Sequence, residues 1–196
     1  MMIGGTDMDY IKELEAYRER EIEVYKRLDL QAVNTVMNVL EEARLSGKHI
    51  FICGNGGSAA TASHYAGDFN KGVSEHQDKK YNFECLSDNV PTMMAVANDI
   101  SYDEVFRFPL RNKMKPGDIF IGISGSGNSR NVVNAMEYAN EISGTTIAIV
   151  GFDGGKLKGM ADYAIHVDVN DMQISEDIHM ILDHMMMWIL SHGKGC

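Results

Sequence analysis

Five short apolar segments, each separated from the next by a segment with helical character, constrain the fold of this chain more than any other feature. Apolar runs of this length alternating with helices indicate βαβ units and therefore a parallel sheet. Five strands fit one α/β domain with a doubly wound parallel sheet and helices on both faces. The expected strands are HIFICG (49–54), NFECLS (82–87), DIFIGIS (118–124), TIAIVG (146–151) and YAIHVDV (163–169).

Two helices precede the first of these strands. Apolar residues spaced for one helical face predict an amphipathic helix over residues 8–28, and a second helix is expected over residues 29–46. We expect this pair to form an N-terminal helical hairpin. Further helices are expected over residues 129–142 and 174–192, the last of them rich in Met and His. The 196 residues suffice for one well-packed domain.

The composition argues against several classes of partner. A net charge of -10 without a run of Lys and Arg makes nucleic acid a poor partner. No stretch approaches the about 20 apolar residues that span a bilayer, and the N-terminus becomes charged too early for a signal peptide. Cys53, Cys85 and Cys196 are widely spaced and odd in number, which argues against a disulfide framework. We therefore expect a cytoplasmic protein with Cys53 in its core.

Two loops rich in glycine and serine follow expected strands, where sheets of this kind bind ligands. In residues 54–58, glycines let the backbone approach an anion, and the next helix directs its free N–H groups at it. Residues 124–129 offer three hydroxyls and two glycines for the oxygens of a terminal phosphate. Together they predict a site for a phosphorylated small ligand. The candidate residues are Asn55, Gly56, Gly57, Ser58, Ser124, Gly125, Ser126 and Ser129.

Both loops have alternative interpretations. The first also fits the dinucleotide fingerprint G-x-G-x-x-A, but the acidic residue expected about 20 positions later is missing. A Walker loop is excluded because no Gly-Lys-Ser/Thr follows. The second loop can equally be a flexible turn in which Ser129 caps the next helix.

Histidines and carboxylates on two expected helices form a second candidate site. His64 and Asp68 are four residues apart, so they share one helix face just beyond the first loop. A surface ion pair, or a histidine paired inside the core, explains the spacing of His64 and Asp68 equally well. The last helix carries Glu176, Asp177, His179, Asp183 and His184. Two histidines and two carboxylates drawn from the two helices can hold Zn²⁺ or a similar divalent ion, or supply an acid and a base for moving protons on a sugar.

Longer motifs lie between residues 50 and 190: GNGGSAATASHYAGDF, AVANDISYDEVF, GISGSGNSRNVVNAMEYA, GFDGGKLKGMADY and EDIHMILDH. Taken together, in this order, they resemble the phosphoheptose isomerase family of sugar isomerase (SIS) domain proteins. That family interconverts sedoheptulose 7-phosphate and an aldoheptose 7-phosphate. The resemblance implies one flavodoxin-like SIS domain over residues 1–196, with residues 1–47 used in assembly and residues 48–196 forming the α/β core. It also implies a homotetramer with active sites at subunit boundaries.

The resemblance further implies roles for individual residues. Asp99 would contact substrate hydroxyls. Family members commonly bind zinc at a set of metal and acid–base positions, which implies one Zn²⁺ per site and favours His184 over His179. Those positions coincide with His64, Asp68, Glu176 and His184. The residues expected to hold the sugar phosphate are Asn55, Ser58, Ser124, Ser126 and Ser129.

Three positions depart from the family pattern. The family has Glu as its general base where this chain has Asp68, which is one methylene shorter, and catalytic geometry is sensitive to such a change. The family has Gln where this chain has Glu176, so Glu176 can take over the base role, and the added negative charge favours a divalent metal. The middle of the family's Ser-Thr-Ser loop is Gly125 here, which removes one hydroxyl.

The resulting hypothesis is an aldose–ketose isomerase that converts sedoheptulose 7-phosphate to an aldoheptose 7-phosphate through an enediol, for bacterial lipopolysaccharide or capsule. Asp68 or Glu176 takes the carbon proton, and His184 serves the oxygens. The alternatives are a non-catalytic SIS protein that binds a phosphosugar or a protein partner, and an isomerase of a different phosphosugar.

Overall fold

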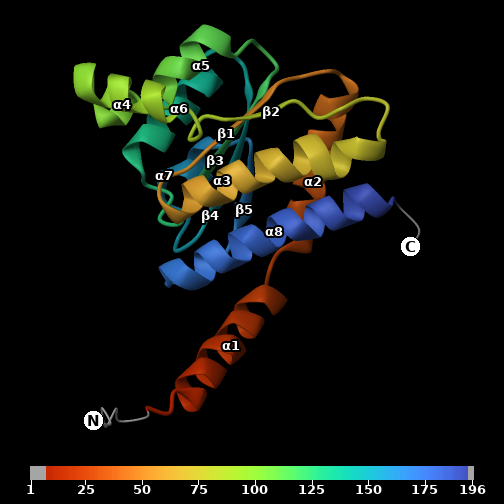
Figure 1. Cartoon of the computed structure of the whole chain (residues 1–196), viewed down its shortest axis with the longest axis vertical. Helices are drawn as coiled ribbons and strands as arrows, with labels where there is room; N and C mark the ends of the chain where they lie inside the picture. The colour runs from red at the N-terminus through yellow and green to blue at the C-terminus, as the bar shows by residue number, and fades with distance from the viewer. Residues whose placement is uncertain (1–7, 194–196) are drawn as a thin grey trace, which may run out of the picture.

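The computed structural model describes residues 8–193, and its centre is one parallel sheet of five strands (Figure 1). The strand order β2-β1-β3-β4-β5 confirms the doubly wound α/β fold that the sequence predicted. Order reverses at β1, which has β2 on one side and β3 on the other. The strands are β1 Ile50–Cys53, β2 Phe83–Cys85, β3 Ile119–Ser124, β4 Thr145–Val150 and β5 Tyr163–His166.

Helices connect the strands and flank the sheet, as predicted. The two N-terminal helices, the helix after the second loop and the long last helix all fall within two or three residues of their expected bounds. The α-helices are α1 Ile11–Lys26, α2 Leu30–Leu45, α3 Gly57–Gly67, α4 Val90–Asp99, α5 Arg107–Lys113, α6 Arg130–Glu141, α7 Gly155–Met160 and α8 Met172–His192. A π-helical segment, η1 (Asp68–Val73), continues α3, and short 3-10 turns follow at η2 (Ser74–His76) and η3 (Tyr102–Glu104).

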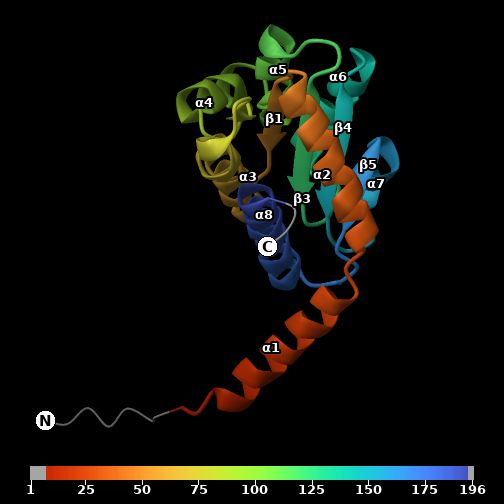
Figure 2. The ribbon, with the colours of Figure 1, turned by 90° about the vertical axis from the view of Figure 1, so that its right-hand side faces the viewer.

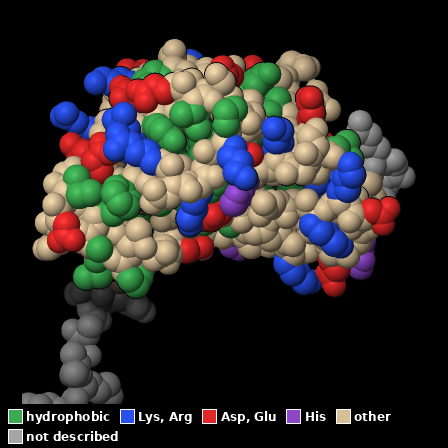
Figure 3. Space-filling model, turned by 90° about the horizontal axis from the view of Figure 1, so that it is seen from above, with side chains coloured by type: hydrophobic (Ala, Val, Ile, Leu, Met, Phe, Trp, Pro, Cys, Tyr) green, Lys and Arg blue, Asp and Glu red, His purple; other side chains and the backbone are tan. Residues whose placement is uncertain are grey.

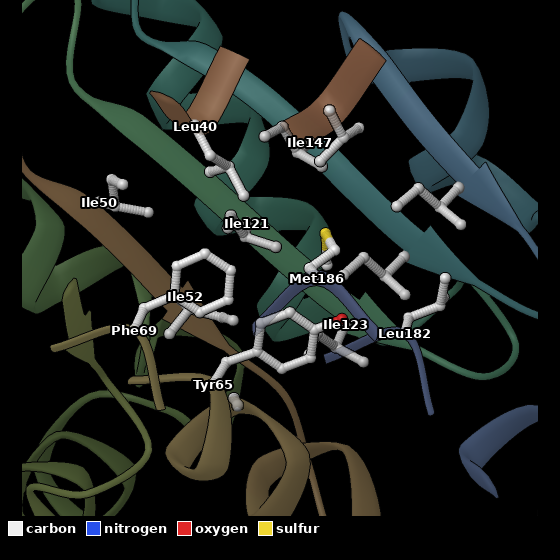
Figure 4. Packing of buried hydrophobic residues seen from close by; sticks show 14 of the residues in the cluster. Leu40, Ile50, Ile52, Tyr65, Phe69, Ile121, Ile123, Ile147, Leu182 and Met186 are labelled. Atoms are coloured by element: carbon white, nitrogen blue, oxygen red, sulfur yellow. The ribbon is translucent and has the colours of Figure 1, made fainter. Parts of the chain in front are cut away.

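Side chains alternate across the sheet and form a separate hydrophobic core on each face. Ile50, Ile52 and Ile121 point to the face covered by α2, α3 and α8, where Figure 4 shows them packed with Tyr65 and Leu182. The opposite face packs residues of α5, α6 and α7 against β-strand side chains that include Cys53. Cys53 is therefore a core residue, as expected. Cys85 is also buried with a free thiol, whereas Cys196 lies outside the described residues.

Helices α3 and α8 lie side by side on the same face of the sheet (Figure 1). Helix α8 also packs against η1, where a Cβ on Gly72 would lie 2.5 Å from the Met187 Cε atom. Because α3 starts at the end of β1, the chain brings α8 alongside the first glycine-rich loop. The last helix is thereby placed next to the predicted ligand site.

Helix α1 stands away from the sheet layers and reaches beyond the body of the molecule (Figures 1 and 2). It contacts the beginning of α8, where Arg20 pairs with Asp171 at 2.9 Å and the Tyr17 hydroxyl donates to the Asp177 carboxylate. That hydrogen bond raises the pKa of Tyr17 to about 12. Much of the apolar side of α1 is exposed: Ile11, Leu14, Tyr17, Ile22 and Tyr25.

No helix within residues 8–193 is both long enough and apolar enough to cross a bilayer. On the face seen in Figure 3, acidic and basic side chains are interspersed.

Candidate functional site

The two glycine-rich loops follow β1 and β3, the neighbouring strands between which the sheet order reverses. Crevices at this switch point are where open parallel sheets bind ligands. In the first loop, Gly56 has a φ of +54°, a left-handed conformation that favours glycine, and α3 begins at the next residue. Gly57 is closely approached: a Cβ there would lie 2.2 Å from the Glu176 Oε2 atom. The start of α3 and the carboxylate of α8 are therefore in contact.

In the second loop, Ser129 does not cap α6 through its side chain. The Ser129 hydroxyl instead lies 3.0 Å from the hydroxyl of Ser124. Gly127 has a φ of +64°, and a Cβ on it would lie 2.0 Å from the Gly154 carbonyl oxygen, so only glycine fits. Ser129 is thus the N-cap residue of α6 by position, but its hydroxyl faces that of Ser124 and does not bond to the helix N–H groups.

An amide pair joins the two loops. The side chains of Asn55 and Asn131 exchange two hydrogen bonds of 2.9 Å each, and the Tyr102 hydroxyl donates to Asn55 Oδ1 at 2.8 Å. The Asn55 side chain is held by Asn131 of α6 and by Tyr102, and its predicted contact with a phosphate stays a prediction. Asn131 is buried in α6, and neither it nor Tyr102 was singled out from the sequence.

One cavity of about 180 Å³ lies between the loops and α8. We call it the loop cavity. Most of its walls are residues that the sequence analysis selected, including Glu176, while Gly56 and Gly57 lie beside it at the start of α3. The volume is smaller than the about 300–1,000 Å³ of common ligand pockets, so it suits one end of a ligand. The lining residues are Asn55, Ser58, Ile123, Ser124, Gly125, Ser126, Ser129, Met172 and Glu176.

A second group of polar side chains lies further along the same two helices. We call His64, Asp68, Asp183 and His184 the histidine–aspartate cluster, because one donor atom from each lies within 4.8 Å of the others. His64 Nε2 is 3.0 Å from His184 Nε2 and 3.6 Å from Asp68 Oδ2. Imidazole nitrogens and carboxylate oxygens at this spacing can hold a divalent metal ion. Glu176, predicted as the fourth ligand, is not in this group.

Asp183 was among the candidate carboxylates of the last helix, but it was not in the set of metal and acid–base positions implied by the family resemblance. It is fully buried, and both of its carboxylate oxygens are without a hydrogen-bond partner. Burial, and then the negative charge of Asp68, raises the pKa of Asp183 to about 8. A buried carboxylate with no partner costs several kcal/mol unless a cation or donor satisfies it, so this residue supports a cation at the cluster. An acidic residue within the apolar run MILDHMMM was the available sequence signal.

Asp68 marks the point where α3 changes from α-helical to π-helical geometry. Isolated π-helical turns are rare and frequently occur at functional sites. His64 and Asp68 keep their expected position on one helix face, and the wider π-helical geometry begins at Asp68.

Two other predicted residues lie apart from both groups. His179 is buried in α8 with neither ring nitrogen hydrogen-bonded, and burial lowers its pKa to about 4. It is a neutral core histidine, which agrees with the choice of His184 over His179. Asp99 is exposed at the end of α4 and accepts a hydrogen bond from Asn98. It does not line the loop cavity of its own chain, so its contact with substrate hydroxyls stays a prediction.

Comparison with known proteins agrees with this architecture. The sequence profile described as SIS domain matches residues 9–151. A probable phosphoheptose isomerase from Thermoplasma acidophilum is 35% identical over 170 residues, covering 87% of this chain and 93% of the relative. A phosphoheptose isomerase from Helicobacter pylori strain Shi470 is 34% identical over 186 residues, covering 95% and 94%. The chain belongs to the phosphoheptose isomerase family of SIS-domain proteins.

Solved structures of the family have the same fold. The phosphoheptose isomerase of Neisseria gonorrhoeae superposes with a TM-score of 0.86 at 26% identity, covering 94% of this chain and all of that one. A phosphoheptose isomerase from Francisella tularensis gives a TM-score of 0.86 at 22% identity and 95% coverage of this chain, a likeness of fold. The family resemblance read from the sequence motifs is therefore confirmed.

One departure from the phosphoheptose isomerase pattern has a visible structural counterpart. Where the family has threonine in its Ser-Thr-Ser loop, a Cβ on Gly125 would lie 2.4 Å from the Met172 sulfur. Met172, at the start of α8, thus occupies the space that the missing side chain would take. The loop cavity keeps its wall but exchanges a hydroxyl for a thioether, which is at most a weak hydrogen-bond acceptor.

Proposed function

We propose that this protein is a phosphosugar isomerase that converts sedoheptulose 7-phosphate to an aldoheptose 7-phosphate through an enediol. The observation that carries the proposal is the loop cavity, which joins two serine- and glycine-rich loops to the carboxylate of Glu176. Relatives named phosphoheptose isomerase at 34–35% identity support the substrate class. The product would serve the synthesis of bacterial lipopolysaccharide or capsule.

The loop cavity would receive the phosphate end of the sugar. The hydroxyls of Ser58, Ser124, Ser126 and Ser129 line it, and the free N–H groups at the start of α3 and α6 add donors for the phosphate oxygens. A heptose phosphorylated at carbon 7 carries its reacting carbons at the opposite end. Binding energy gained at the phosphate would therefore hold carbons 1 and 2 in position for proton transfer.

Isomerisation moves one proton between neighbouring carbons and others between oxygens. Asp68 or Glu176 would take the proton from carbon and return it to the neighbouring carbon, while the exposed His184 imidazole would exchange protons with the oxygens. His64, Asp68 and His184 fit a divalent metal ion, which we propose to be one Zn²⁺ per site. When bound, such an ion would polarise the sugar carbonyl as a Lewis acid.

We further propose that the whole chain acts as one SIS domain in a cytoplasmic homotetramer. Residues 1–47 would serve assembly and residues 48–196 would form the α/β core. The exposed apolar side chains of α1 support this role, because a helix standing outside the fold gains stability when a neighbouring subunit covers them. Asp99 would then reach a substrate bound by another subunit. The mass of the particle by light scattering tests the assembly.

The decisive experiment is an NMR time course of the purified protein with sedoheptulose 7-phosphate in D₂O, with and without added Zn²⁺. We expect aldoheptose signals carrying deuterium at carbon 2, because the enediol exchanges its proton with solvent. Sedoheptulose without phosphate is the matched control and should not react at the same concentration. Broadening of the sedoheptulose 7-phosphate signals without conversion would refute the isomerase and support a non-catalytic phosphosugar-binding protein.

A further inference from the structure

Asp183 is the strongest unexplained feature of the two helices that carry the site. Its carboxylate is wholly buried between α8 and the helix α3, yet both oxygens are without a hydrogen-bond partner. Buried charged groups in proteins are paired with an opposite charge or coordinate a metal. Within residues 8–193, no Lys or Arg forms an ion pair with Asp183, and its only ion-pair neighbour is the imidazole of His64, at 4.0 Å.

The distances around His64 Nε2 fit a tetrahedral metal site. This nitrogen lies 3.0 Å from His184 Nε2, 3.6 Å from Asp68 Oδ2 and 4.0 Å from Asp183 Oδ2. Ligand atoms bound tetrahedrally at 2.0–2.1 Å lie about 3.3 Å from one another, so the observed separations bracket that value. Two neutral imidazoles and two carboxylates also balance the charge of a divalent cation.

Glu176 occupies a different place. Its carboxylate packs against the Cα of Gly57 and lines the loop cavity. Glu176 and His184 are eight positions apart, which places their Cα atoms about 12 Å apart along the helix axis. The cluster of donor atoms within 4.8 Å is complete without it.

We propose that Asp183, and not Glu176, completes the metal site with His64, Asp68 and His184, and that Glu176 is left free as the acid–base group of the sugar cavity. The metal assignment stands on the cluster alone. The role given to Glu176 rests on the proposed function. In this chain, Asp183 thus takes the place at the metal that the family pattern assigns to position 176, two helical turns earlier in α8.

The test is a titration of metal-stripped protein with Zn²⁺ against a competing chelator, with no sugar present. The matched variants are Asp183→Asn and Glu176→Gln, each of which replaces one carboxyl group of α8 by an amide of nearly the same size. We expect Asp183→Asn to weaken Zn²⁺ binding at least about tenfold. Glu176→Gln should bind within about threefold of the unaltered protein. Co²⁺ provides a second readout, because the intensity of its visible absorption reports four-coordinate geometry.

Circular dichroism before titration checks the fold of each variant. If Asp183→Asn does not fold, Asp183→Leu provides a second variant that removes the oxygens and suits an apolar surrounding. Wild-type Zn²⁺ affinity in a folded Asp183 variant would overturn the assignment, and so would a loss of tenfold or more in Glu176→Gln. Because this titration contains no sugar, it can succeed even if the isomerase assay with sedoheptulose 7-phosphate fails, and the two proposals are tested separately.

Discussion

The loop cavity and the histidine–aspartate cluster lie along the same helix, α8, but satisfy their polar groups in opposite ways. In and around the loop cavity, Ser124 pairs with Ser129 and Asn55 with Asn131, so the side chains hold one another in place. In the cluster, Asp183 has no hydrogen-bond partner and two imidazole nitrogens lie 3.0 Å apart. The polar groups of the first region are satisfied by one another, whereas the carboxylate of Asp183 in the second would be satisfied by the proposed cation.

This difference follows from the ligand that each region suits. A phosphate needs many weak donors held in fixed positions, and small side chains with backbone N–H groups provide them at little cost in the free protein. A metal ion needs a few strong donors crowded together, and such donors repel one another or stay protonated until the ion arrives. The following predictions test this contrast in order of decreasing effect.

The largest effect is expected from His184→Asn. In the proposed mechanism the exposed imidazole exchanges protons with the oxygens of the sugar, so its loss should reduce kcat about 10²- to 10⁴-fold, as expected for a general acid–base group. Circular dichroism should not change, because the side chain is at the surface. His192→Asn is the control, since it makes the same exchange at the exposed end of α8. Equal turnover in the two variants would remove His184 from the mechanism.

In the loop cavity, Ser126→Ala should raise KM for the phosphosugar about 10- to 100-fold and change kcat less. Losing a hydrogen bond to a charged phosphate is worth about 1.5–3 kcal/mol. Steady-state kinetics measure both constants. Ser46→Ala, at the exposed end of α2, is the matched exchange and should alter neither. A fall in kcat with unchanged KM would place Ser126 at the reacting end of the sugar.

Breaking the hydrogen-bonded pair of Asn55 and Asn131 should loosen the walls of the loop cavity. Asn131→Ala removes two of the three side-chain hydrogen bonds of Asn55, so the free energy of unfolding should fall by about 1–3 kcal/mol and KM should rise. Urea unfolding and kinetics measure these changes. Tyr102→Phe is the milder comparison, because it removes one hydrogen bond at an exposed side chain and should cost no more than about 1 kcal/mol. An unchanged KM in Asn131→Ala would show that the loops hold their positions without this pair.

The smallest effect concerns His179, which separates the two regions along α8. Its pKa is lowered to about 4 in the folded protein, against the ordinary histidine value of 6.5, so the unfolded chain binds a proton more readily. Its contribution to stability is therefore complete above about pH 6.5 and is lost as the pH falls toward 4. As the pH falls from 7.5 to 5.5, protonation of His179 in the unfolded chain should lower the free energy of unfolding by about 1 kcal/mol.

Urea unfolding of metal-stripped protein at the two pH values measures this loss. The His179→Leu variant should lose about 1 kcal/mol less than the unaltered chain over the same interval. Identical pH dependence in the two proteins would mean that His179 is protonated equally in the folded and unfolded states.

The sequence predicted the sheet and the loop cavity well for a local reason. Apolar runs such as residues 118–124 define strands by themselves, and a loop that follows a strand is fixed at the sheet edge as soon as the strand is placed. Residues of both loops consequently met where they were expected to meet.

The carboxylate of the proposed metal site could not be chosen by the same reasoning. Glu176 and Asp183 are seven residues apart, which is close to two full turns, so periodicity places both on one stripe of α8. Which of them meets His64 depends on where α8 crosses α3, and that is set by tertiary packing. The pairing of Asn55 with Asn131, 76 residues apart in sequence, likewise appears only in the folded chain.

The joint between α1 and α8 has a mechanical consequence. Asp171 accepts the Ile174 N–H that starts α8 and also holds Arg20 of a helix that stands outside the sheet layers. Glu176 follows within the next turn and a half of the same helix. A displacement of the exposed part of α1 would therefore be transmitted through Asp171 to the first turns of α8, and so to the carboxylate in the loop cavity.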